Sequence, residues 1–422
     1  MFKRIKEGIY DTCYIWTKEM RSVISDEGVL IFFILVPLIY PLLYSWAYNN
    51  EVVRDVPVAV VDFSNSQTSR QFIRQCDASP DVRVAYRCAS LDEARQLVGH
   101  QVVRGILYFP ADFEEKLGRM QQSKVSVYCD MSMMLAYKAI YATSMAVSQD
   151  MNAGIQVKLS GNYTDREDAI LTKPLDFEEV QMFNTTGGYG NFILPCVLVL
   201  ILQQTLLLGI GLSAGTAREN NRYKDLVPVS RHYNGIFRIV FGKSLCYFMI
   251  YAVMAAYITL IVPRIFSFTS IPQASDLFAL MLPYLLSCIF FGMFLSCVVR
   301  YRENVILLVV FTSLPFLFLA GISWPESSLP PVWRSLAYLQ PSTFGVRGFV
   351  RISSMGATLD DVTHEYMCLW IQSLVYFFAT CAVYKFQLTQ ARRHAVETIV
   401  KIKRKAEKHK MKVEGRRLRV EC

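Results

Sequence analysis

The chain has 422 residues, of which 53% are hydrophobic and only 19% are charged. This composition is too apolar for a soluble globular protein and too polar for a bare bundle of membrane helices, so it indicates a membrane protein with one sizeable soluble insert. The formal net charge of +9 raises the question of a nucleic-acid partner, and the distribution of the charge decides it.

Lysine and arginine are concentrated in a few segments of the chain. There are 5 in residues 1–27, 6 in 214–243, 2 in 300–303 and 13 in 385–422. The segments 263–277 and 323–365 hold only 1 and 3. Because apolar runs separate the two groups, the basic segments fall on one side of a membrane, which is the cytoplasmic side by the positive-inside rule. Topology therefore explains the charge, and we expect no nucleic-acid partner.

Residues 1–27 are expected to form an amphipathic helix at the cytoplasmic interface. Apolar residues recur there at steps of three and four, with lysines and arginines beside them: Ile5, Ile9, Cys13, Trp16, Met20, Val23 and Ile24. Such a helix suits the headgroup layer, with its tryptophan as an anchor. Packing against a soluble partner is the alternative.

The first membrane span is expected at 28–48, interrupted by Pro37 and Pro41. No small-residue cleavage site follows it, so we expect a retained helix that delivers the chain to the outside. Residues 49–187 then form an extracytoplasmic domain. Strand-like runs at 57–62, 82–87, 102–109 and 124–128 alternate with helical runs that end near 76, 98, 120 and 159, which predicts a mixed α/β domain.

The eleven cysteines form no CxxC pair and no cluster with zinc-like spacing, so no metal is expected. Cys76 and Cys88 both lie in the soluble insert. A disulfide between them and two buried free thiols are equally open from the sequence.

Five further spans are expected within 188–387, at 192–213, 245–262, 277–299, 305–322 and 366–384. A basic cytoplasmic loop at 214–243 joins the first two of these. An outer hairpin at 323–365, rich in proline and aromatic residues, is expected to be partly re-entrant or to lie on the membrane. The basic tail at 388–422 is expected to be a helix on anionic lipid. The predicted fold is a six-helix α bundle with an inserted extracytoplasmic α/β domain.

No catalytic constellation is visible in the sequence. Gly242-Lys243-Ser244 ends like a phosphate-binding loop, but Phe237 stands where that loop needs its first glycine and no strand precedes it. A lysine at the membrane entry is the ordinary interpretation, and we expect no ATP hydrolysis by this chain alone. The five histidines are scattered, and no acid or base lies deep in a span.

Gln203 and Gln204 are the most polar pair inside a span. An interhelical hydrogen bond is favoured over a substrate contact at this pair. Gly211 and Gly215 have the spacing of a helix–helix contact, which is a weak signal at the end of a span.

Taken together, several motifs resemble the permease of a type-2 ABC exporter, in the subgroup with a large extracytoplasmic insert between the first two spans. The resemblance covers nearly the whole chain, and its motifs are individually weak but fairly specific in their order and spacing. They are PVAVVD at 57–62, RGILYFPADFE at 104–114, Arg218-Glu219, LVPVS at 226–230, Gly242-Lys243, GISWP at 321–325 and LQPSTF at 339–344. Family members usually have a second acid soon after the first in the central loop, whereas Asn220-Asn221 follows Glu219 here.

The resemblance implies a half-transporter that pairs with a second permease, identical or paralogous, and with two cytoplasmic ATPase subunits that hold the ATP. Arg218, Glu219, Pro228 and Lys243 would form the coupling loop, and the helix with Trp16 and Met20 would be pushed with it. The outer domain would gate the exit or meet a periplasmic adaptor protein.

The location implied is the bacterial inner membrane, with both termini cytoplasmic. The lack of charge in the spans favours an amphipathic, lipid-like or drug-like substrate. The main alternative is a membrane-anchored receptor or assembly factor whose outer domain binds a ligand or protein.

Overall fold

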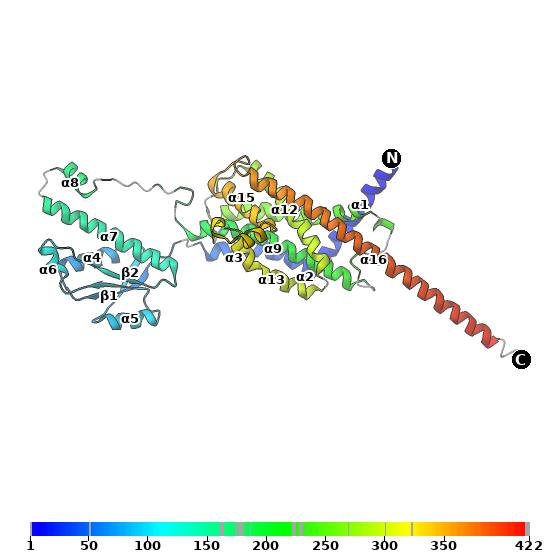
Figure 1. The fold of residues 1–422 in the computed structure, drawn as a ribbon, viewed down its shortest axis with the longest axis horizontal. Helices are drawn as coiled ribbons and strands as arrows, with labels where there is room; N and C mark the ends of the chain where they lie inside the picture. Colours follow the sequence, from blue (N-terminus) through cyan, green and yellow to red (C-terminus); the bar gives the residue numbers. More distant parts are fainter. Residues whose placement is uncertain are drawn as a thin grey trace. The chain divides into compact units, whose positions relative to one another are not determined.

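The computed structural model describes residues 2–49, 52–160, 164–173, 175, 180, 182–185, 187–221, 225–227, 231–233, 235–268, 270–299, 301–321 and 324–417. The chain divides into two compact units (Figure 1). A helical unit comprises 1–49, 183–185 and 189–422, and a smaller α/β unit comprises 50–182 and 186–188.

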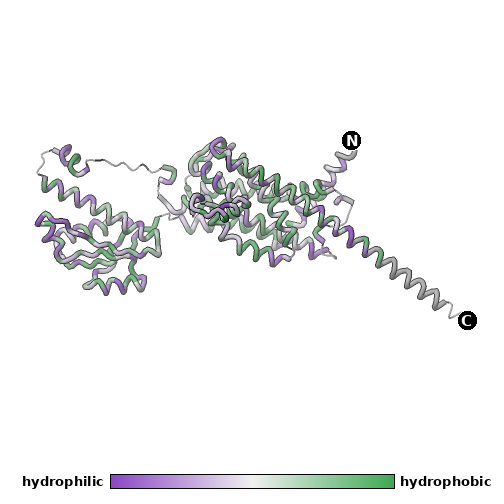
Figure 2. The backbone as a smooth tube through the Cα atoms, in the orientation of Figure 1, coloured by the Kyte–Doolittle hydropathy of each residue, from purple (hydrophilic) through white to green (hydrophobic). Residues whose placement is uncertain are grey.

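Within the described residues, six helices of the helical unit are long and apolar enough to cross a membrane, as the sequence predicts. Hydrophobic residues dominate these helices in Figure 2. They are Glu27–Ala47, Tyr189–Glu219, Ile236–Ile265, Ala274–Val298, Arg302–Leu319 and Thr363–His394. The spans α9 (Tyr189–Glu219) and α12 (Ala274–Val298) are the most deeply buried, whereas α13 (Arg302–Leu319) leaves most of its apolar surface exposed.

Two of the spans contain a π-helical turn directly before a proline. The first runs through α2 (Glu27–Leu30), η1 (Ile31–Leu35) and α3 (Val36–Ala47), with Pro37 just after the turn. The third runs through α10 (Ile236–Ala256), η3 (Tyr257–Ile261) and α11 (Val262–Ile265), with Pro263 in the same place. Because proline has no N–H and its ring clashes with the carbonyl four residues earlier, a wider turn lets the helix continue past it.

The helices extend further than the sequence predicts. Helix α9 continues to Glu219 and α10 begins at Ile236, so the predicted loop 214–243 is reduced to a connector at 220–235. Its described part includes the short η2 (Arg231–Tyr233). Helix α16 (Thr363–Arg417) joins the last span to the tail as one helix that passes through 387 and 388.

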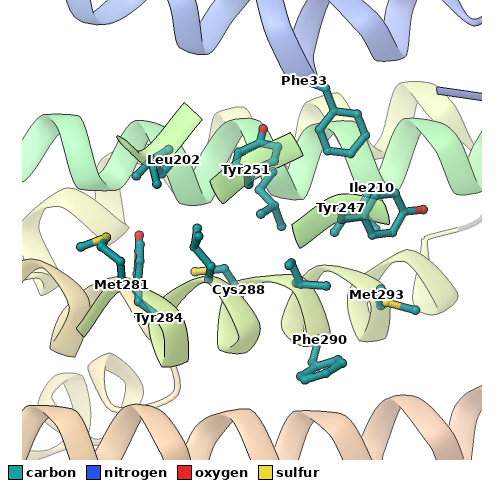
Figure 3. Close-up of a cluster of buried hydrophobic side chains, with 14 of the residues drawn as sticks. Phe33, Leu202, Ile210, Tyr247, Tyr251, Met281, Tyr284, Cys288, Phe290 and Met293 are labelled. Atoms are coloured by element: carbon teal, nitrogen blue, oxygen red, sulfur yellow. The ribbon is translucent and has the colours of Figure 1, made fainter. Parts of the chain in front are cut away.

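The core of the helical unit lies between α9, α10 and α12 (Figure 3). Phe33 stacks on Tyr247 with ring centroids 5.5 Å apart, and the Tyr284 hydroxyl donates to the carbonyl of Val199 over 2.8 Å. Glycine lets the neighbouring helix come close, because a Cβ at Gly345 would lie 2.3 Å from the ring of Tyr284.

The outer hairpin enters the bundle. It contains η4 (Glu326–Ser328), α14 (Pro331–Ala337) and α15 (Pro341–Met355), and α15 is largely buried. Its turn lies against the middle of α9, where the Gln203 side chain bonds Gln340 and the backbone of Ser342. These bonds satisfy polar groups at the start of α15, where the N–H of Ser342 has no partner within its own helix.

The α/β unit contains one four-stranded sheet in the order β2-β1-β3-β4. β1 (Val56–Asp62), β2 (Val82–Arg87) and β3 (Gly105–Phe109) are parallel, and β4 (Ser126–Cys129) is antiparallel to β3. The helices α4 (Gln67–Asp77), α6 (Phe113–Gly118) and α7 (Met134–Ser160) cover one face and α5 (Leu91–Gly99) covers the other (Figure 1); the short α8 (Asp165–Thr172) follows α7. All the predicted strands and helices are present, and the largest shift is at β3, predicted from 102.

Cys76 and Cys88 are free thiols. Cys76 belongs to the hydrophobic cluster on the α4 face of the sheet and Cys88 to the cluster on the α5 face. Because the sheet separates them, the disulfide is excluded and the alternative of two buried thiols holds. Burial raises the pKa of the Cys76 thiol to about 12, so it stays protonated.

Candidate functional site

The N-terminal helix α1 (Phe2–Ser25) lies along α10 and turns a line of acids toward the bundle. Asp11, Glu19 and Asp26 are 8 and 7 residues apart, which places them on one side of a helix. Ile15 and Val23 lie between them and are fully buried. Each of the three carboxylates contacts a cation from another segment.

Asp11 connects α1 to the connector and to the start of α10. Its carboxylate lies 2.6 Å from Nη1 of Arg238 and 2.8 Å from Nδ1 of His232. The rings of Tyr14 and His232 also pack together, 4.4 Å apart. The hydrogen bond to His232 and the guanidinium of Arg238 outweigh partial burial, and they hold the pKa of Asp11 below its usual value.

Glu19 is a buried carboxylate with three donors around it. Nζ of Lys243 lies 2.9 Å from Oε2, and the hydroxyls of Ser213 and Tyr247 both donate to Oε1. Burial pushes the pKa of Glu19 up, but the charge of Lys243 and these hydrogen bonds outweigh it, so the pKa is lowered and the carboxylate stays ionised. Glu19 therefore joins α1 to both α9 and α10.

Asp26 joins the start of the first span to α9 and α13. It is the N-cap of α2 and accepts the backbone N–H groups of Gly28 and Val29. Nη2 of Arg302 lies 3.0 Å from its Oδ1, and the hydroxyl of Thr216 donates to Oδ2. Burial pushes the pKa of Asp26 up, and the bond from Thr216 with the other donors brings it below its usual value.

Arg218 and Glu219 do not pair with each other. Arg218 is buried and donates to the carbonyls of Val299 and Cys297, at distances of 2.5 and 3.2 Å. It thereby satisfies the C-terminal end of α12. The side chain of Glu219 is 58% exposed, and its Oε2 lies 3.9 Å from Nη1 of Arg302. Glu219 therefore makes no ion pair with the neighbouring Arg218, and Arg222 lies outside the described residues.

The connector is anchored by apolar residues and by α16. Leu226 and Val227 are buried in the bundle core, and Asp225 lies 3.1 Å from Nδ1 of His394. Lys18 of α1 stands 5.4 Å from the ring of Tyr233. Pro228, assigned to the coupling loop by the resemblance, lies outside the described residues.

The apolar stripe predicted on α1 divides between the bundle and the surface: Val23 is buried in the bundle core, and Trp16 and Met20 pack partly against it. Ile9 and Ile24 are each 61% exposed and Cys13 is exposed, while Trp16 and Met20 are half-buried. A hollow of about 260 Å³ lies over this stripe, lined in part by Trp16, Met20 and Ile24. The helix thus buries the side that carries its acids, Ile15 and Val23, and leaves Ile9, Cys13 and Ile24 exposed.

The two glutamines of α9 behave differently. Gln203 is fully buried, and its Nε2 donates to Oε1 of Gln340 over 3.1 Å, so the predicted hydrogen bond between segments is present. The amide of Gln204 is buried with no hydrogen-bond partner among the described residues. Nearby on α9, a Cβ at Gly211 would lie 2.4 Å from Val305 of α13, which makes this glycine the point of close helix approach.

Sequence reasoning missed Asp11, Glu19 and Asp26 as structural contacts. Their spacing on one helical side was the available signal, but acids beside an apolar stripe are ordinarily solvent-facing. In the described part of the chain no group of residues could hold a metal ion. Every carboxylate of this cluster faces a cation or several donors, so the arrangement is suited to holding helices together.

Comparison with known proteins agrees with this architecture. A family model described as "ABC-2 family transporter protein" matches residues 28–382. Two relatives, from Escherichia coli strain K12 and Escherichia coli O157:H7, are both described as "Probable multidrug ABC transporter permease YbhR". Each is 23% identical over 370 residues, covering 84% of this chain and 93% of the relative. The match runs from the first span into the last, and the chain belongs to the ABC-2 family of transporter proteins.

Proposed function

We propose that this chain is the permease subunit of an ATP-driven exporter that moves an amphipathic, lipid-like or drug-like substrate out across the bacterial cytoplasmic membrane. The family and the multidrug permease relatives support a transport role. The sequence holds no phosphate-binding loop, so the proposal assigns ATP to two separate ATPase subunits and pairs this chain with a second permease, identical or paralogous.

The observation that carries the coupling part of the proposal is the set of contacts made by α1. Asp11, Glu19 and Asp26 tie this helix and its end to α10 through Arg238 and Lys243 and to α13 through Arg302. The hydroxyls of Ser213 and Thr216 on α9 donate to Glu19 and Asp26. A force applied to α1 or to the connector therefore reaches two spans through short, partly buried ion pairs and a third through hydrogen bonds. Such a linkage is what a permease needs in order to follow the movement of an ATPase.

The proposed orientation places α1, the connector and the part of α16 that follows the last span in the cytoplasm. The lysine and arginine excess of these segments supports it. The α/β unit then faces the periplasm, where it gates the exit or meets an adaptor protein. The alternative, a membrane-anchored receptor or assembly factor, is kept because the α/β unit is a compact body of its own.

Co-purification separates these two functions. The full chain, expressed in its native host with an affinity tag, should retain an ATPase subunit in mild detergent. The purified chain alone should hydrolyse no ATP above background and should gain activity only with that subunit. If adaptor or ligand proteins co-purify with the chain and an ATPase subunit never does, the result would favour the receptor or assembly factor. Hydrolysis by the lone chain that survives Lys243→Ala would reveal a nucleotide site of its own.

A further inference from the structure

The α/β unit contains a hollow of about 630 Å³ that the coupling function does not use. It lies between α4, α6, α7 and the segment that enters β4, on the α4 face of the sheet. The volume is within the range of about 300–1,000 Å³ in which proteins hold small-molecule ligands.

One wall of the hollow is an apolar stripe of α7. Tyr141, Met145, Ser148, Met151 and Ile155 recur at steps of three and four and line it. The adjacent side of α7, with Ile140 and Val147, is buried against the sheet, and Met151 packs against the same cluster. Tyr141 and Met145 nevertheless remain 50% and 46% exposed. Helix α7 therefore has an apolar face that the rest of the α/β unit covers only in part.

Phe72 of α4 and Phe113 of α6 contribute aromatic rings to the same hollow. These residues also belong to the buried cluster under the sheet, so the apolar lining continues from the core of the unit to its surface. An aliphatic or aromatic chain placed here would bury itself against side chains that are already ordered.

The polar part of the lining carries a positive charge. Lys124 is its one charged residue, and its side chain is exposed, with no ion pair among the residues that the structure describes. No carboxylate lines the hollow. The nearby Glu114 accepts the hydroxyl of Thr68 over 3.0 Å. The hydroxyl of Ser123, next to Lys124, is buried without a hydrogen-bond partner in the described part of the chain.

We propose that this hollow binds an anionic amphipath: an aliphatic chain between Tyr141, Met145 and Phe113, and a carboxylate or sulfate head at Lys124 and Ser123. A cationic amphipath would meet an ammonium and no counter-charge there. The binding requires neither ATP nor a partner subunit, so it is measured separately from transport, and failure of one leaves the other standing.

The test uses the full chain in nanodiscs of phosphatidylcholine and a dodecanoate that carries a photoreactive diazirine on its tail. After irradiation, mass spectrometry should locate saturable adducts on peptides from 113–127 and 141–155. Unlabelled dodecanoate should compete, and dodecyltrimethylammonium should not. Labelling that is confined to the spans, or that never saturates in these peptides, would show that the hollow is not such a site.

Two variants sharpen the result. Lys124→Ala removes an exposed side chain. It should raise the probe concentration needed for half-maximal labelling about fivefold, which is the order of one exposed charge contact. Lys138→Ala is the matched control, because this exposed lysine of α7 does not line the hollow. Ser148→Trp should fill the hollow and abolish labelling of its peptides. Equal loss in Lys124→Ala and Lys138→Ala, or equal competition by the cationic amphipath, would overturn the charge assignment.

Discussion

Lys243 of α10 places its ammonium 2.9 Å from the carboxylate of Glu19 on α1, and both side chains are more than nine-tenths buried. The two residues are 224 positions apart, so this contact fixes the N-terminal helix to a span in the middle of the chain. A buried ion pair of this kind adds little net stability to the fold. It nevertheless constrains the geometry strongly, because either charge alone is costly to bury. It therefore makes α1 part of the bundle.

The first prediction concerns this pair. Lys243→Met should destabilise the helical unit by about 3–5 kcal/mol, because it leaves the Glu19 carboxylate buried without its cation. The double variant Glu19→Gln with Lys243→Met should recover much of that loss, since no unpaired charge remains. Thermal unfolding of the purified chain, followed by tryptophan fluorescence, measures both. If the double variant is as unstable as Lys243→Met, the unpaired Glu19 charge is not the cause of the lost stability.

The second prediction is the pH dependence of the same contacts. The pKa values of Asp11, Glu19 and Asp26 are all lowered in the folded protein. Their stabilisation is therefore complete above the ordinary carboxylate pKa of about 4 and is lost as the pH falls through the lower folded values. Between pH 7 and pH 5 we expect a flat melting temperature, and below about pH 4 a fall that is smaller in Asp11→Asn than in the wild type. A variant whose melting temperature falls in parallel with the wild type would rule out Asp11 as a contributor.

The spans and the α/β elements could be predicted because their signals are local. An uncharged run such as 192–213 is long enough to cross a membrane by itself, and a cap such as Ser66 marks the start of α4 within a few residues. The helix ends could not be placed as well. Tertiary contacts such as those of Arg218 with the end of α12 extend α9 beyond its apolar run.

The buried side of α1 was beyond sequence reasoning for a different reason. Hydrophobic periodicity identifies the apolar stripe of a helix but not which neighbour it faces. Here Ile9 and Ile24 of the stripe are exposed whereas Val23 is buried, and the packed side carries acids whose cations lie more than 200 residues away. No local pattern connects Asp26 with Arg302, so only the fold reveals the cluster.

The third prediction tests the packing of the re-entrant hairpin. Gly345→Ala would place a Cβ 2.3 Å from the Tyr284 ring, and we expect a loss of about 1–3 kcal/mol of stability from overpacking. Gly8→Ala is the control, because its nearest neighbour would be a side-chain atom of Arg238 at 3.5 Å, an ordinary contact. Resistance to proteolysis in detergent should fall for the first and stay unchanged for the second. Equal resistance would mean that α15 has room to move away from α12.

The fourth prediction concerns topology, which the lysine and arginine asymmetry motivates. In a cysteine-less background, Ser66→Cys and Ser328→Cys should react with an impermeant thiol reagent in intact cells. Ser230→Cys and Thr398→Cys should react only after the cells are opened. Labelling at position 230 in intact cells would reverse the proposed orientation and, with it, the cytoplasmic position of the connector.

The last prediction returns to Glu219, at the end of α9. Its side chain is 58% exposed and 3.9 Å from Arg302, and an exposed pair contributes about 0–1 kcal/mol to stability. Glu219→Ala should therefore insert and unfold like the wild type. If Glu219 instead contacts the ATPase subunit, truncation should cost about 2–5 kcal/mol of binding, seen as loss of co-purification and of export.

Glu303→Ala is the matched control for this variant, because Glu303 is another exposed acid, in the first turn of α13 next to Arg302. It should retain export and its ATPase subunit. Recovery of Glu219→Ala by an opposite charge change on the ATPase would establish the pairing. Full export and normal co-purification of Glu219→Ala would instead remove this residue from the coupling path. The test would then move to α1, with Trp16→Ala and Met20→Ala, since these half-buried residues line a hollow on its surface.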